Sequence, residues 1–94
     1  MTTKTEKLTL ISGSFSNQEA KEILTSIFSS KIKFHELKNF SSQERFGKDD
    51  ETAAKRLPLL REEQAKLLHI LKQAEQGNRS IRINSEILIT TDAD

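Results

Sequence analysis

The sequence predicts an α+β domain in which an antiparallel helical hairpin packs on a two-stranded β-sheet, in the order β-α-α-β. Two observations support this fold class. Both ends of the chain alternate apolar and polar residues, as half-buried strands do, and the long middle carries apolar residues at helical spacing. The segment GKDDE interrupts that middle and is the clearest loop, so we expect one helix on either side of it.

The predicted strands are residues 7–15 and 80–91. In the first, KLTLISGSF, Leu8 and Leu10 occupy alternating positions, and Gly13 marks either a weak strand end or a β-bulge. In the second, SIRINSEILITT, apolar residues alternate with polar ones, so one face is expected to be apolar. The residues expected on that face are Ile81, Ile83, Ile87 and Ile89.

The first predicted helix begins at a capping box, in which the Ser16 hydroxyl accepts the N–H of Glu19 and the Glu19 carboxylate reaches back. We expect this helix to reach about Ser41. A second cap, formed by Ser41 with Glu44, then allows a short turn that ends at Gly47. A strand over KIKFHEL fits the spacing less well than a helix. The apolar stripe expected to face the second helix is Ile23, Ile27, Phe34 and Leu37.

The second predicted helix has heptad spacing but contains a proline. It begins near Arg56, or it begins near Asp50 and bends at Pro58. The dipeptide Gly77-Asn78 is expected to stop it. The positions expected in the seam between the helices are Ala53, Leu57, Leu60, Gln64, Leu67, Leu71 and Ala74.

A hairpin closed at the loop brings the middles of the two helices together. It places Ser29 and Ser30 beside Gln64 and Glu63, which predicts a polar Ser–Gln layer inside the seam that fixes the register. It also places Lys31 near Glu62, where we expect an exposed ion pair worth roughly 0–1 kcal/mol.

The bulk composition describes a single small domain, residues 1–94, with an ordered core over about residues 7–90. Hydrophobic residues make up 34% and charged residues 31%, so the core is small. The net charge of +1 gives no strong field toward nucleic acid or anionic lipid. The chain has no cysteine and no apolar run of the length of a signal peptide or membrane span, so we expect a soluble, cytoplasmic protein without disulfides or a membrane partner.

The predicted sheet is too small to be stable alone. Two strands are marginal in water and leave two exposed edges. A chain this short also buries more apolar surface when it associates. We therefore expect a homodimer, joined through sheet edges, helix faces or both, and the sequence does not specify any other protein partner.

We expect no catalytic residue, no cofactor and no metal site, because no motif for such chemistry is present in the sequence. His35 and His69 are potential zinc ligands, but the hairpin separates them by roughly 16 Å. The cluster of Asp49, Asp50 and Glu51 lacks the spacing of a calcium loop and suits the positive end of the second helix. We therefore expect a protein that is not an enzyme.

The stretch KIKFHELKNFSSQERFG, residues 31–47, interleaves basic and aromatic residues, as surfaces that bind single-stranded nucleic acid do. Glutamates dilute its charge and its lysines point in different directions, so we prefer to interpret it as a solvated helix face. A nucleic-acid-associated protein is the alternative hypothesis. Its binding residues would be Lys31, Lys33, Lys38, Arg45 and Lys48.

Phenylalanines recur at every sixth position from residue 28 to residue 46. Six residues turn a helix by about 600°, so these rings cannot all face one core. Phe28 and Phe34 fit the buried side, whereas Phe40 falls nearly opposite. Either the helix breaks near Asn39, or Phe40 is exposed and contacts a partner. The residues predicted for an interface are Phe40, Phe46, Ile87 and Ile89.

Three runs, GSFSNQEAKEIL, KIKFHELKNFSSQERFG and INSEILIT, resemble a small family of uncharacterised bacterial proteins with no known activity. The likeness covers Ile11 to about Thr90. It implies a bacterial, cytoplasmic origin and no site residue, and Pro58 departs from the uninterrupted helix expected there. Our leading hypothesis is a non-enzymatic interaction or scaffold module that associates with itself.

Overall fold

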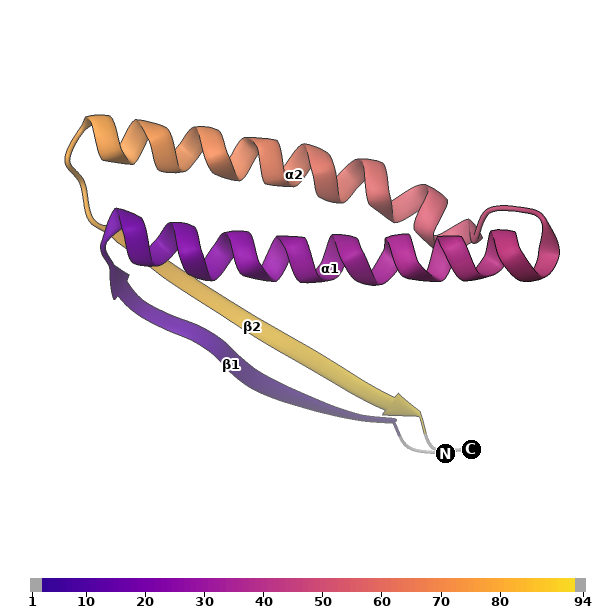
Figure 1. The fold of residues 1–94 in the computed structure, drawn as a ribbon. Coiled ribbons are helices and arrows are strands. Elements are labelled where there is room, and N and C mark those ends of the chain that lie inside the picture. The colour runs from indigo at the N-terminus through magenta and orange to yellow at the C-terminus, as the bar shows by residue number, and fades with distance from the viewer. Residues whose placement is uncertain (1–2, 93–94) are drawn as a thin grey trace.

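The computed structural model describes residues 3–92 and shows a helical hairpin beside a two-stranded antiparallel sheet (Figure 1). The α+β fold class and the order β-α-α-β predicted from the sequence are confirmed. The elements are β1 (Thr3–Phe15), α1 (Asn17–Phe46), α2 (Glu51–Gln76) and β2 (Ile81–Asp92).

Both ends of α1 are capped, and the helix between them is uninterrupted. The backbone N–H of Glu19 donates to Ser16 Oγ at 3.1 Å, and the N–H of Ser16 donates to Glu19 Oε1 at 2.9 Å, which confirms the capping box. At the other end Gly47 adopts a left-handed φ of 68°, and its N–H donates to the carbonyl of Gln43 at 2.9 Å. The predicted end near Ser41 is wrong, because Gly47 takes this conformation without strain and is the residue that stops the helix.

Side chains from the last turns of α1 fix the loop between the helices. Asn39 Oδ1 accepts the N–H of Asp50, and Ser42 Oγ donates to the carbonyl of Lys48, both at 2.9 Å. Asp50 in turn caps α2, because its Oδ2 accepts the N–H of Ala53 at 2.9 Å. Asn39 is therefore not a break in α1 but an anchor for the start of α2.

Pro58 lies inside α2, which begins at Glu51 rather than near Arg56. Proline has no N–H to donate to the carbonyl of Ala54, and its ring crowds that carbonyl, so a bend is expected here. The first turns of α2 incline toward α1 (Figure 1). The predicted stop after α2 is confirmed, with Asn78 in a left-handed conformation at φ 51°.

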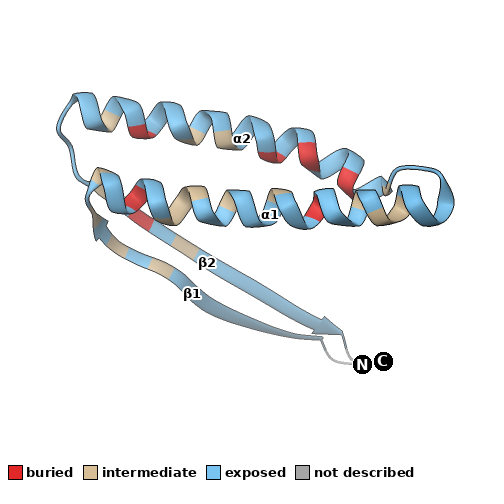
Figure 2. Ribbon diagram, in the orientation of Figure 1, coloured by how far each residue is buried: buried red, intermediate tan, exposed pale blue. Residues whose placement is uncertain are grey.

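The seam between the helices confirms the heptad predicted for α2 and corrects the stripe predicted for α1 (Figure 2). All seven predicted α2 seam residues, Ala53 to Ala74, are buried or half-buried. Three of the four residues of the predicted α1 stripe do not lie in the seam, since Ile27, Phe34 and Leu37 are 39%, 52% and 59% exposed. The fourth, Ile23, is half-buried. The shielded positions of α1 that recur at steps of three and four are instead Thr25, Phe28, Ile32, His35, Asn39 and Ser42.

Because a different side of α1 faces α2 than the sequence predicts, the contacts predicted in the middle of the hairpin are also wrong. The polar layer expected from Ser29 and Ser30 is wrong, because both residues are exposed. The ion pair expected for Lys31 is replaced by one between Arg61 Nη2 and Glu36 Oε2 at 2.9 Å, with both side chains at least half exposed.

A β-bulge at Leu10 brings the apolar residues of both strands onto one face of the sheet. The antiparallel register shifts between Thr9 and Ile11, which leaves Leu10 without a paired residue. Directly paired residues point to the same face, so the extra residue returns Ile11 to the face that carries Leu8. The residues of this apolar sheet face are Leu8, Ile11, Phe15, Ile81, Ile83, Ile87 and Ile89.

Gly13 is required by its own backbone conformation rather than by the bulge. It pairs with Ile83 and has a φ of 152°, which residues with a side chain rarely adopt. A Cβ at this position would lie 3.7 Å from the ring of Phe15, which is an ordinary contact, so the φ angle and not a lack of space favours glycine. The bulge that the sequence allowed at Gly13 is therefore found earlier in β1, where no glycine or proline signals it.

The core lies at the end of the molecule where the sheet meets the hairpin. Its centre is Ala20, Leu71 and Ile83, which are 0%, 6% and 9% exposed. Beyond this core the sheet diverges from the helices (Figures 1 and 2), and no large side chain in residues 3–92 is fully buried. The half-buried residues packed around the centre are Ile11, Phe15, Leu24, Leu67 and Ile81.

Candidate functional site

The outer part of the apolar sheet face is uncovered. Leu8, Ile87 and Ile89 are 50%, 39% and 44% exposed, and we call them the outer sheet patch. Leu8 and Ile87 are directly paired, so their side chains lie side by side on the face that carries Ile83 of the core. The patch therefore continues the core outward along the sheet.

A second uncovered strip runs outward from the core along α1. Ala20, Ile27 and Phe34 recur at intervals of seven residues, so they lie on nearly the same side of the helix. Ala20 packs in the core, whereas Ile27 and Phe34 are 39% and 52% exposed, and we call these two the open α1 strip. Ile27 and Phe34 line a shallow hollow together with Ser30 and Lys31.

Positive charge surrounds the open α1 strip. The ammonium nitrogens of Lys31 and Lys38 lie 5.5 and 5.7 Å from the centroid of the Phe34 ring, within range of a cation–π attraction. Arg45 follows Lys38 by seven residues and lies on the same side of the helix. The structure thus groups three of the five predicted nucleic-acid residues, while Lys33 lies on another side of α1 and the fifth lies in the loop.

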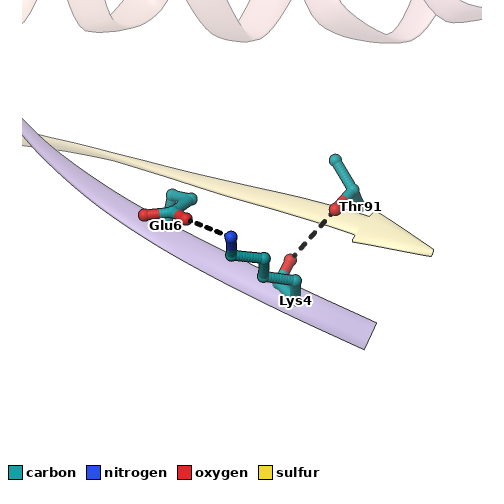
Figure 3. Close-up of polar contacts among 3 residues, drawn as sticks. All are labelled: Lys4, Glu6 and Thr91. Atoms are coloured by element: carbon teal, nitrogen blue, oxygen red, sulfur yellow. Dashed lines mark hydrogen bonds and ion pairs between the residues drawn. The ribbon is translucent and has the colours of Figure 1, made fainter. Parts of the chain in front are cut away.

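The outer sheet patch ends in a charged rim, which Figure 3 shows. Glu6 pairs with Ile89 in the register, so its carboxylate lies on the apolar sheet face. It forms an ion pair with Lys4 at 3.2 Å, and the two side chains are 59% and 76% exposed (Figure 3). Thr91 Oγ1 donates to the carbonyl of Lys4 at 3.5 Å and marks the outer end of the same face (Figure 3).

The four residues predicted for an interface do not form one surface. All are exposed, and Ile87 and Ile89 belong to the outer sheet patch. Phe40 is turned by about 600° from Phe34, so it lies on a different side of α1 from the open strip. Leu8, Ile27 and Phe34, which the sequence-based prediction does not include, are exposed as well. The sequence pattern places Ile27 and Phe34 in the helical seam instead.

The two histidines lie in different environments. His35 is 5% exposed in the seam, and its two ring nitrogens have no hydrogen-bond partner. Its ring packs edge-on against the ring of Phe34, with the two ring centroids 5.3 Å apart. His69 is exposed on α2. In the part of the chain that the structure describes, no three potential ligands of the His, Cys, Asp or Glu type come together to hold a metal ion.

The remaining acidic residues singled out in the sequence stabilise the loop and the helix ends. Asp49 accepts a hydrogen bond from Gln43 Nε2 at 2.7 Å, and Asp50 caps α2. Hydrogen bonds from the Ser16 backbone N–H, and secondarily its side chain, hold the pKa of the Glu19 carboxyl below its ordinary value.

A broad groove lies at the base of the hairpin, between the first turns of α1 and the last turns of α2. Its charged lining mixes both signs, so it presents no field of a single sign to an ionic ligand. These residues are Lys21, Glu22, Lys72, Glu75 and Arg79.

No protein-family model, curated protein or solved structure matches this chain. The resemblance to a family of bacterial proteins therefore stays a prediction. Neither of the two helices within residues 3–92 has an apolar segment that could cross a membrane.

Proposed function

We propose that this chain is a non-enzymatic module that associates with itself as a homodimer, in the cytoplasm of a bacterium. The observation that supports the proposal is the apolar surface left uncovered beside a small core. Thirteen large apolar side chains among the described residues are more than a third exposed, and several of them continue the core outward. Those that continue it are Leu8, Ile87 and Ile89 on the sheet and Ile27 and Phe34 on α1, and exposed apolar patches beside a core are typical of an interaction site.

The size of the exposed surface supports the same proposal. The accessible surface is 7615 Å² for a chain of 10.7 kDa, whereas a compact monomer of that mass exposes about 5,500 Å². The radius of gyration is 17.1 Å, against about 12 Å for a compact domain of this length. A stable interface of ordinary size takes about 800 Å² from each partner. The surplus of about 2,000 Å² is therefore ample for a dimer.

The sheet supplies a third argument. A two-stranded sheet is marginal in water unless its apolar face is covered. The helices cover only the end near Ile83, so Leu8, Ile87 and Ile89 depend on another chain for burial. A second copy is the partner that is always present at the concentration of the chain itself.

Thermal unfolding at a series of protein concentrations tests this proposal. For a dimer, each hundredfold rise in concentration stabilises the folded state by about 2.7 kcal/mol of dimer, so the melting temperature rises with concentration. A melting temperature that does not change with concentration, for a protein that sediments at the monomer mass, would contradict the proposal.

A nucleic-acid-associated role is the second candidate, favoured by the cations of Lys31 and Lys38 on either side of Phe34. A surface with cations and an exposed ring suits stacked bases of a single strand. Fluorescence anisotropy with labelled single-stranded DNA and RNA at low salt separates the two candidates. Binding that weakens as salt rises, and that a Lys31→Glu variant loses, would favour this second role. Our leading proposal expects no such binding.

A further inference from the structure

We infer that the second copy docks crosswise, with the outer sheet patch of each chain seated on the open α1 strip of its partner. This inference rests on the self-association proposed above and adds which surfaces meet. The occupant of both surfaces is a second copy of this chain.

The outer sheet patch and the open α1 strip both begin at the core and lie farther apart with distance from it. Along the sheet, Ile83 is buried and Ile87 and Ile89 are exposed. Along α1, Ala20 is buried, and the strip that continues its side of the helix is exposed. The core fixes the sheet and the hairpin at one end, and the two diverge beyond it (Figure 1), so one chain does not close them on each other.

In a two-fold dimer the same pair of contacts occurs twice, because each chain presents both surfaces. In crosswise docking, a single two-fold axis places the outer sheet patch and the open α1 strip of both chains against apolar surfaces. Docking the two sheets face to face would cover the outer sheet patch and leave Ile27 and Phe34 in water.

Glu6 lies next to Ile89 on the sheet face, and Lys31 and Lys38 flank Phe34 on α1. Seating the outer sheet patch over the Phe34 ring therefore brings the Glu6 carboxylate, which pairs with Lys4 of its own chain at 3.2 Å, toward two ammonium groups at the rim of the contact. Complementary charges at a rim fix the register and suppress wrong pairings.

Edge-to-edge pairing of sheets is a weaker solution for this chain. The bulge at Leu10 interrupts β1, and charged Lys4, Glu6 and Lys7 follow one another along its outer half. Bulges and charged side chains on an edge strand hinder its pairing with another strand.

The chain contains no cysteine, so an engineered thiol is unique. We would mix a Thr91→Cys copy with a Lys38→Cys copy and treat the mixture with a short bis-maleimide cross-linker. Thr91 lies on the apolar sheet face and Lys38 flanks the open α1 strip, so both replacements leave the apolar residues in place. The matched control is Thr90→Cys, because its side chain points to the opposite face of the sheet.

Crosswise docking predicts that the Thr91→Cys and Lys38→Cys mixture links in at least tenfold higher yield than the mixture containing Thr90→Cys. A dimer in which Thr91→Cys links mainly to itself, and not to Lys38→Cys, would overturn the inference and leave the proposed self-association intact. A monomer mass, with no cross-linked product in any mixture, would contradict both the crosswise docking and the proposed self-association.

Charge reversal gives an independent test on the uncrosslinked protein. Glu6→Lys is expected to raise the dimer dissociation constant several-fold, and a Lys31→Glu, Lys38→Glu change in the same chain is expected to restore it. The matched control is Glu86→Lys, because Glu86 also forms an ion pair, with Lys7 at 3.8 Å, but lies on the opposite face of the sheet. Equal effects of Glu6→Lys and Glu86→Lys would contradict crosswise docking.

Discussion

The two ends of the molecule carry the same apolar pattern but differ in what covers it. At the closed end, Ile83 of the apolar sheet face packs against Ala20 and Leu71. At the open end, Ile87 and Ile89 of the same face are 39% and 44% exposed (Figure 2). Apolar residues therefore continue in phase beyond the core and stay exposed in this chain, and the proposed self-association rests on this observation.

The largest effect is expected at the closed end, for Leu71→Ala. Leu71 is 6% exposed at the centre of a small core, so its truncation leaves a cavity and costs about 2–5 kcal/mol in the free energy of unfolding. The matched change at the open end, Ile87→Ala, is expected to destabilise the isolated chain by much less. Urea unfolding at low protein concentration measures both, and equal losses would show that the two ends do not differ.

A smaller effect, of opposite sign, is expected for His35→Leu in the seam of the hairpin, where the free energy of unfolding should rise. Both ring nitrogens of His35 are buried without a partner, so an apolar side chain of similar size removes an uncompensated desolvation cost. We expect a stabilisation of about 1–2 kcal/mol in the same urea assay. The control is His69→Leu, an exposed position on α2, where we expect a change within about 0.5 kcal/mol. A loss of stability for His35→Leu would indicate that the ring has a partner.

Ser16→Ala tests the junction between the sheet and α1. The side chain accepts the N–H of Glu19 at the helix start, and removal of such a cap costs about 1 kcal/mol. Thermal unfolding followed by circular dichroism measures the loss. If Ser16→Ala has the stability of wild type, the capping box does not stabilise the junction between the sheet and α1.

The smallest expected effect is the contribution of Glu19 to the pH dependence of the free energy of unfolding. Its pKa is lowered from the ordinary 4.5, so the ionised group stabilises the folded state fully above that value. The contribution is lost as pH falls through the lowered pKa. The advantage of wild type over Glu19→Gln is therefore constant at neutral pH and shrinks below about pH 4.5. Unfolding curves recorded from neutral to acid pH check this, and an advantage that grows in acid would have the wrong sign.

Much of the fold was predictable because its signals are local. The capping box at Ser16, the heptad of α2, the stop at Gly77-Asn78 and the alternation of β2 each depend on residues close in sequence. These local signals also gave the order of elements and the antiparallel hairpin. Pro58 left two alternatives for the start of α2, and the cap provided by Asp50 decides between them.

The side of α1 that faces α2 was not predictable from periodicity, because α1 has apolar residues on more than one side. The true seam includes Thr25, His35 and Asn39, which look unsuitable for a core, while the more apolar stripe through Ile27 and Phe34 is open. Periodicity therefore assigns the strongest apolar stripe to the hairpin, whereas Ile27 and Phe34 of that stripe are 39% and 52% exposed. The bulge at Leu10 was not predictable either, because no glycine or proline marks it in the sequence.

Light scattering of the native protein, beside two lysine variants, determines whether the apolar sheet face joins two chains. We predict about twice 10.7 kDa for wild type and for Thr90→Lys, and the monomer mass for a folded Ile89→Lys, because only Ile89 lies on the apolar sheet face. A wild-type mass of 10.7 kDa at every concentration, or equal masses for the two variants, would contradict the account.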